Sequence, residues 1–129
     1  MNAPQGKAGS ILVVDDDATF RGVLARSLTS RGYDVSIAAN YLEAVGLCVA
    51  QPPEFAIVDL KMPGRSGLDL VEQIKRVNPA TTVLVLTADR SPESKAEALR
   101  LGACAYVTKP TDADEVIAAL ISGRNRDTQ

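Results

Sequence analysis

The sequence predicts an α/β protein in which a parallel β-sheet carries helices on both faces. Two observations lead to this prediction. Short apolar runs typical of buried strands alternate five times with segments whose apolar residues recur at helical spacing. Glycine, proline, asparagine and aspartate lie at many of the boundaries between these segments, where turns and helix ends are expected. Five strand–helix units in succession require right-handed crossovers, and therefore a parallel sheet.

The five predicted strands differ in their expected exposure to solvent. Continuous apolar runs at 11–14, 55–58 and 83–86 predict three strands that are buried on both faces. Residues 33–37 alternate between apolar and polar, which is typical of an edge strand, and 105–107 form a short last strand. Placing the apolar strands at the centre gives the flavodoxin-like strand order 2-1-3-4-5. A site is then expected at the carboxyl ends of the central strands.

The first two helices have recognisable signals at both ends. Asp17 is suited to be the N-cap of the first helix, and Gly32 is expected to end it. Asn40 and Glu43 resemble a capping box that begins the second helix. Pro52-Pro53 follows that helix and prevents its continuation.

The other three helices follow the later strands. The third begins after a turn-rich segment at 62–67 and carries apolar residues at helical spacing. Ser91-Pro92 provides the N-cap and first-turn proline of the fourth helix, and Gly102 ends it. Thr111, with Asp114 three residues later, is expected to start the fifth.

A length of 129 residues fits one domain of ordinary size. We expect a flexible leader at 1–9, the folded domain at 10–122, and a flexible tail or the start of a linker at 123–129. The leader is polar and contains glycine, proline and alanine, and the tail is polar with two arginines.

Composition excludes several classes of function. Apolar residues make up 46% of the chain and charged residues 23%, which is typical of a globular protein. The net charge of −2 gives no electrostatic footprint for nucleic acid or an anionic membrane, and the apolar runs are too short to span a bilayer. The first residues do not form a secretory signal, so we expect a cytoplasmic protein. The chain contains no histidine, which excludes a Ser-His-Asp triad and a Cys–His nucleophile.

Polar side chains follow the predicted strands at the end of the sheet where the carboxyl ends of the strands lie. Asp15 and Asp16 come after the first strand and Asp59 after the third, while Thr87 and Lys109 follow the fourth and fifth. The first and third strands are expected neighbours, so three carboxylates should meet. Their mutual repulsion requires cations. Lys109 supplies one positive charge, and oxygen ligands favour Mg²⁺, with Mn²⁺ as a substitute, for the remainder. Thr87 and Lys109 complete a set suited to phosphoryl transfer.

The residues alone leave two candidates for the nucleophile. Asp15, in the sequence Asp15-Asp16-Asp17-Ala18-Thr19, fits the D-x-D-x-T pattern of haloacid-dehalogenase-type phosphatases. Those enzymes also use acidic ligands late in the chain, whereas the late acidic residues here are explained by a helix start. Asp59 is the other candidate, and the turn Met62-Pro63-Gly64 follows it. A nucleotide-binding module is a third hypothesis, disfavoured because no glycine-rich loop follows the first strand.

Four sequence blocks together resemble the receiver domain of bacterial two-component response regulators, the CheY-like superfamily. The resemblance covers about Ser10 to Ile121, and the blocks occur in the order and spacing of that family. They are Ile11–Asp17, Val58–Gly64 with Gly67, Val85–Ala88, and Gly102–Pro110.

The resemblance implies a role for each matching residue at the phosphorylation site. Asp59 would accept a phosphoryl group from a histidine kinase. Asp15, Asp16, Asp59 and the backbone carbonyl of Lys61 would hold Mg²⁺. Lys109 would bind phosphoryl oxygens together with a hydroxyl at the end of the fourth strand.

The resemblance also implies a conformational switch. Thr87, at the end of the fourth strand, carries the hydroxyl that would bind the phosphoryl oxygens with Lys109. It would move toward the phosphoryl group while Tyr106 turns inward. The Lys109–Pro110 peptide bond is expected to be cis. Lys61 and Asp89 lie two residues beyond Asp59 and Thr87, and we hypothesise that their opposite charges pair and prolong the life of the phosphoryl group.

The expected function is therefore phosphorelay signal transduction by a phosphoacceptor switch. Such a chain is not an enzyme beyond its own phosphorylation from phosphodonors and slow autodephosphorylation. Its partners would be a sensor histidine kinase or phosphotransfer protein, an effector that the sequence does not identify, and a second copy if phosphorylation drives dimerisation. We expect no membrane binding and no direct binding of nucleic acid by this chain, which could be the receiver part of a longer transcriptional regulator.

Overall fold

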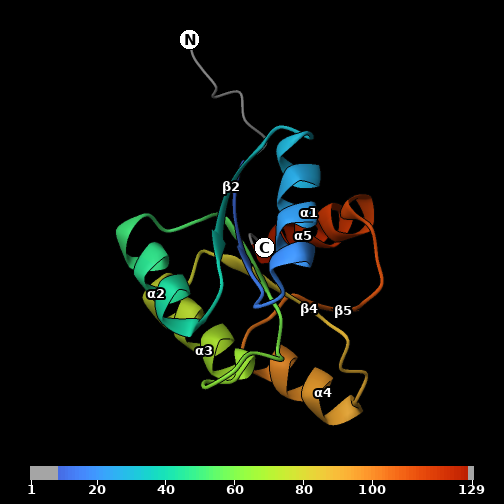
Figure 1. Ribbon diagram of the computed structural model, residues 1–129. Coiled ribbons are helices and arrows are strands. Elements are labelled where there is room, and N and C mark those ends of the chain that lie inside the picture. The colour runs from blue at the N-terminus through green and yellow to red at the C-terminus, as the bar shows by residue number, and fades with distance from the viewer. Residues whose placement is uncertain (1–8, 128–129) are drawn as a thin grey trace.

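A computed structural model describes residues 9–127 and shows a parallel sheet between two layers of helices (Figure 1). The five strands lie in the order β2-β1-β3-β4-β5, which confirms the predicted order. Within the described residues, no helix is both long and apolar enough to cross a membrane. The elements are β1 (Gly9–Val14), α1 (Ala18–Thr29), β2 (Tyr33–Ala38), α2 (Tyr41–Ala50), β3 (Phe55–Val58), α3 (Gly67–Val77), β4 (Thr82–Thr87), α4 (Pro92–Arg100), β5 (Ala105–Thr108) and α5 (Ala113–Asp127).

Successive residues of each central strand enter two separate apolar clusters. In β1, Leu12 and Val14 pack on the side of α2, α3 and α4, whereas Ile11 and Val13 pack on the side of α1 and α5. All four side chains are buried. Alternation across a pleated strand places neighbours on opposite faces. A strand covered on both faces therefore requires a continuous apolar run, and for this reason such runs predict central strands.

Strand β2 lies at an edge of the sheet, as its alternating pattern predicted. It pairs only with β1 among the described strands, and Asp34 and Ile37 are exposed while Tyr33 and Ala38 are buried. The opposite edge is formed by β5, whose four residues are all partly exposed. The two predicted edge strands are thus confirmed.

The predicted starts of the first, second and fourth helices are confirmed. Asp17 Oδ1 accepts hydrogen bonds from the amides of Thr19 (3.0 Å) and Phe20 (3.2 Å). Asn40 Oδ1 accepts from the amide of Glu43, whose carboxylate in turn accepts from the amide of Ala39. The contacts of Asp17 and Asn40 satisfy amides that the first helical turn leaves without an intrahelical partner. Ser91 likewise caps α4, because its hydroxyl oxygen accepts from the amide of Ser94. These three helices therefore begin where the sequence signals placed them.

The predicted start of the last helix was wrong by one residue. The helix begins at Ala113, and the cap is Asp112, whose Oδ1 accepts from the amide of Glu115 at 2.8 Å. Thr111 instead directs its hydroxyl to the Glu115 carboxylate. A carboxylate three residues before an amide reaches the capping position, and here Asp112 has that spacing.

The predicted tail at 123–129 is also corrected, because α5 continues to Asp127. Gly123 lets this part of α5 lie against Cys104, the residue before β5, because a Cβ at position 123 would clash with the Cys104 side chain. Arg126 then donates to the carbonyl of Cys104 at 2.8 Å. These contacts hold the end of α5 against the sheet. Of the predicted leader at 1–9, only Gly9 lies within the described residues, and it belongs to β1.

Candidate functional site

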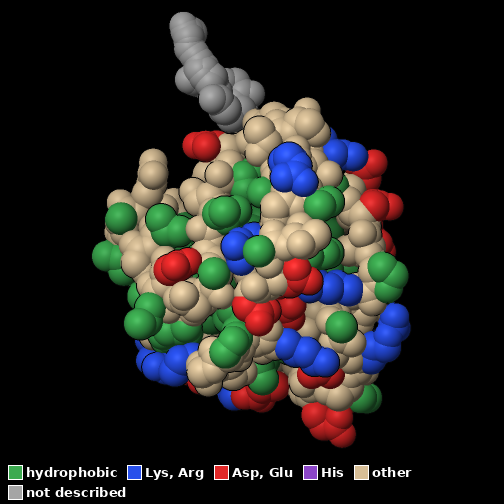
Figure 2. All heavy atoms as spheres, in the orientation of Figure 1, with side chains coloured by type: hydrophobic (Ala, Val, Ile, Leu, Met, Phe, Trp, Pro, Cys, Tyr) green, Lys and Arg blue, Asp and Glu red, His purple; other side chains and the backbone are tan. Residues whose placement is uncertain are grey.

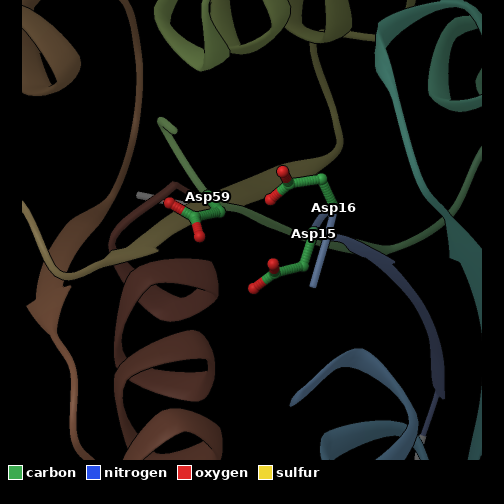
Figure 3. Close-up of side chains that lie close together, drawn as sticks. All are labelled: Asp15, Asp16 and Asp59. Carbon is green, nitrogen blue, oxygen red and sulfur yellow. The ribbon is translucent and has the colours of Figure 1, made fainter. Parts of the chain in front are cut away.

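Three carboxylates meet at the carboxyl ends of β1 and β3, as expected from the predicted strand order. Val14 is in register with Val58, so Asp15 and Asp59 leave neighbouring strands at the same level. The amide of Asp59 donates to the Val14 carbonyl at 3.0 Å. One carboxylate oxygen from each of Asp15, Asp16 and Asp59 lies within 4.8 Å of the others. Figure 3 shows Asp15 and Asp16 at the end of one strand and Asp59 across from them.

The three aspartates are buried to different degrees. Asp15 is 2% exposed and Asp59 is 6% exposed, whereas Asp16 is open to solvent. Asp15 Oδ1 accepts from the amide of Asp17 at 2.9 Å, and Asp59 Oδ1 accepts from the amide of Lys61 at 3.0 Å. Burial raises the pKa of Asp15 despite the hydrogen bonds that favour its ionised form. Two buried carboxylates side by side therefore need a cation.

Lys109 supplies a positive charge to both buried carboxylates. Its Nζ lies 2.9 Å from Asp15 Oδ2 and 2.9 Å from Asp59 Oδ2. Burial by itself would lower the pKa of Lys109, but the two carboxylates outweigh it and raise that pKa. The amide of Lys109 donates to the Thr87 carbonyl at 2.8 Å, and the Lys109–Pro110 bond is cis as expected. Acidic side chains form a group near the middle of the face shown in Figure 2, with basic side chains beside it.

The donor atoms of this cluster suit a hard divalent cation. Carboxylate oxygens are the ligands that Mg²⁺, Mn²⁺ and Ca²⁺ prefer, and Asp15, Asp16 and Asp59 present one each toward a common space. The chain has no histidine to compete for a softer metal. Because Asp15 and Asp59 share Lys109, a cation and the lysine ammonium would neutralise the same two charges.

The two predicted switch residues, Thr87 and Tyr106, are connected through Asp89. Thr87 is fully buried, and its hydroxyl oxygen accepts from the amide of Asp89 at 3.3 Å. The hydroxyl of Tyr106 donates to the carbonyl of Asp89 at 2.6 Å. The Tyr106 ring packs against the apolar cluster beneath α2, α3 and α4, and burial raises the pKa of its hydroxyl. A shift of Thr87 would therefore move Asp89 of the β4–α4 turn and, through it, alter the hydrogen bond to Tyr106.

The hypothesised pairing of Lys61 with Asp89 is not what the structure shows. Asp89 Oδ1 accepts from the amide of Ser91 and Oδ2 from the hydroxyl of Ser94, each at 2.8 Å. No ion pair joins Lys61 to Asp89 in the part of the chain that the structure describes. The bonds to Ser91 and Ser94 lower the pKa of Asp89, and the charge of Lys61 adds to them from a longer distance. Asp89 therefore holds the β4–α4 turn.

We predict that Asp89→Ala loosens the start of α4. Asp89 accepts from the Ser91 amide and the Ser94 hydroxyl, and the loss of these hydrogen bonds should make the first turn of α4 open roughly fivefold faster. Hydrogen exchange of the amides of Ser91 and Ser94 should accelerate by about that factor. Lys61→Ala removes a charge but no bond to α4, so it should leave these amides unchanged. Equal protection in Asp89→Ala and the parent would contradict this role.

Several contacts around the site were not predicted. The guanidinium of Arg21 donates to the Asp15 carbonyl at 2.7 Å, and the Lys109 ammonium lies 4.0 Å above the ring of Phe20. Gly67 begins α3 against the backbone of Asp59 and Leu60, with no room for a Cβ. In the sequence, Phe20 is an apolar residue at helical spacing with no polar group of its own. No local pattern distinguishes a core phenylalanine from one that also covers a lysine.

A family model described as "Response regulator receiver domain" matches residues 11–121. Two curated relatives are the acid tolerance regulatory protein ActR of Rhizobium meliloti and the photosynthetic apparatus regulatory protein RegA of Rhodovulum sulfidophilum. ActR is 40% identical over 116 residues, which are 90% of this chain and 60% of ActR. RegA is 37% identical over 117 residues, which are 91% of this chain and 64% of RegA. The chain thus spans less than two thirds of the length of these relatives.

One similar solved structure is a response regulator protein from Burkholderia pseudomallei. It is 37% identical, with a TM-score of 0.86, over 92% of this chain and 70% of that one. That protein was crystallised with a phosphorylated aspartic acid, a calcium ion and citrate. The likeness extends from fold to sequence across nearly the whole described chain.

Proposed function

The chain belongs to the receiver domains of response regulators, and on that premise we propose that it is a phosphoacceptor switch. Asp59 would take a phosphoryl group from a sensor histidine kinase or a phosphotransfer protein, with Mg²⁺ in the acidic cluster. The observation that carries the proposal is the contact of one lysine ammonium with both buried carboxylates, at 2.9 Å each.

The chemistry follows from the positions of these groups. A carboxylate oxygen of Asp59 would attack phosphorus while Lys109 neutralises charge on the phosphoryl oxygens. Asp15, Asp16, Asp59 and the carbonyl of Lys61 would hold Mg²⁺, which when bound supplies further positive charge at the transferring group. The phosphorylated bacterial relative, with its calcium ion, supports an acidic pocket of this kind. Hydrogen bonds from the backbone amides of Asp17 and Lys61 orient the side chains of Asp15 and Asp59 before a phosphodonor binds.

The signal would be a local change of charge that the β4–α4 turn passes on. A phosphoryl group adds up to about two negative charges and strong acceptor oxygens. The Thr87 hydroxyl would turn toward them, and its link through Asp89 to Tyr106 would carry the change to the face formed by β4, α4, β5 and α5. Slow hydrolysis of the acyl phosphate would then reset the site.

We further propose that this receiver controls a transcriptional regulator of which it forms one part. The regulatory relatives are longer than the region they share with this chain, and another relative is the DNA-binding transcriptional regulator NtrC of Escherichia coli. Phosphorylation-dependent dimerisation is a further proposal, which sizing of the phosphorylated protein would test.

Removal of the metal is the direct test of the proposed reaction. Intact mass after incubation with acetyl phosphate and Mg²⁺ should rise by about 80 Da, the mass of one phosphoryl group. Excess EDTA should reduce the modified fraction at a fixed time by at least tenfold, because the cluster then lacks its divalent charge. A gain of the same size and rate in EDTA would show that the acidic cluster does not need a metal.

A further inference from the structure

Three groups surround the ammonium of Lys109. Its Nζ lies 2.9 Å from an oxygen of Asp15, 2.9 Å from an oxygen of Asp59, and 4.0 Å from the centroid of the Phe20 ring. An ammonium group has three N–H donors, and the carboxylates engage two of them. The negative face of an aromatic ring attracts a cation at this distance. Phe20 therefore contacts the lysine that joins the two buried aspartates, although its carbon ring cannot itself bind metal or phosphate.

The Phe20 ring is fixed from two directions. Its backbone lies in the first turn of α1, where its amide donates to Asp17 Oδ1 at 3.2 Å. Its partly buried side chain packs against the apolar cluster between the sheet and helices α1 and α5. A ring held in this way can determine where a flexible side chain rests against it, which a freely rotating surface ring could not do.

The position of the Lys109 ammonium matters because four rotatable bonds lie between it and the backbone. The lysine side chain is 18% exposed, and the ring covers one of its sides. When a phosphoryl group arrives, the ammonium must remain beside Asp59 and meet the incoming oxygens. The Phe20 ring on one side of the ammonium favours this position over rotamers that point into solvent.

We propose that Phe20 is a positioning residue for phosphoryl uptake, because its ring face holds the Lys109 ammonium where the phosphoryl oxygens arrive. This inference rests on the proposed phosphoacceptor function. With acetyl phosphate as donor, a carboxylate oxygen of Asp59 forms a bond to phosphorus. The bond from phosphorus to the acetate oxygen breaks, and acetate leaves with the electron pair. Lys109 contributes only charge to this step, and Phe20 acts only through Lys109.

The test compares rings of equal shape and different electron density. Phenylalanines carrying one, two or three fluorines on the ring are placed at position 20, and the rate of the mass gain is followed with acetyl phosphate and Mg²⁺. Each fluorine weakens the negative ring face, so the rate should fall stepwise, to about three- to tenfold below the parent. Phe20→Tyr should stay near the parent rate, and Phe20→Leu should match the most fluorinated ring. Val23→Ala, one turn along α1 at a half-exposed position, is the matched control and should react as the parent does.

Two results would overturn the inference. Equal rates across the fluorinated series, in a parent that does take up a phosphoryl group, would refute the role of Phe20 alone. A parent that takes up no phosphoryl group under any of these conditions would refute the proposed function and this inference together. A purely structural role of Phe20 predicts lower stability of Phe20→Leu with no graded effect of fluorine, which thermal melts of the same proteins distinguish.

Discussion

Asp59→Asn is expected to abolish phosphoryl uptake, so that the parent gains about 80 Da with acetyl phosphate and Mg²⁺ and the variant gains nothing. An amide is a far weaker nucleophile than a carboxylate, and it removes one of the negative charges of the metal cluster. The fold should survive the change. Asn retains one oxygen, which can still accept from the Lys61 amide, and Lys109 loses its contact with position 59 but keeps its pair with Asp15.

Two further variants make this result specific. Asp17→Asn removes a negative charge beside the site but keeps a helix cap, and it should retain uptake at the parent rate. Asp15→Asn distinguishes the phosphoacceptor from a phosphatase that uses Asp15 as nucleophile. Under our proposal it slows uptake without removing the Asp59 modification, whereas a phosphatase would lose covalent modification completely. Loss of modification in Asp15→Asn combined with its retention in Asp59→Asn would reverse the assignment.

Gly67→Ala is expected to be the most damaging single methyl group that could be added near the site. The new Cβ would lie 2.4 Å from the Asp59 carbonyl oxygen and 2.6 Å from Leu60 Cα. Both are backbone atoms that cannot rotate away, so α3 or the loop after β3 must shift. We expect the free energy of unfolding to fall by about 3 kcal/mol and uptake at Asp59 to slow by at least about tenfold. Urea unfolding and the mass assay measure the two effects.

Gly46→Ala is the matched control for this substitution. Gly46 lies within α2 on its exposed side, and a Cβ there meets no atom within 4 Å. Alanine is a better helix former than glycine, so this variant should be more stable than the parent by about 0.5–1 kcal/mol. Its phosphoryl uptake should be unchanged. If Gly67→Ala were as stable and as active as Gly46→Ala, the tight approach of α3 to Asp59 would have no functional importance.

The fold and the membership of the acidic cluster follow from the order of residues along the chain. Apolar runs at β1, β3 and β4 identified the central strands, because a strand covered on both faces buries every side chain. The strand order then placed Asp15, Asp59 and Lys109 at one edge of the sheet. Positions at the ends of parallel strands follow from backbone topology alone, so the convergence needed no knowledge of side-chain conformation.

Which side chains surround those groups depends on how the elements pack against one another. The ring of Phe20 over Lys109 and the bonds of Asp89 to Ser91 and Ser94 depend on how each helix is rotated against the sheet and on rotamers. The same holds for the end of α5, which continues to Asp127 and lies against Cys104 at Gly123. Periodicity specifies which face of an element is buried, but contacts between elements distant in sequence arise only when the whole core is packed.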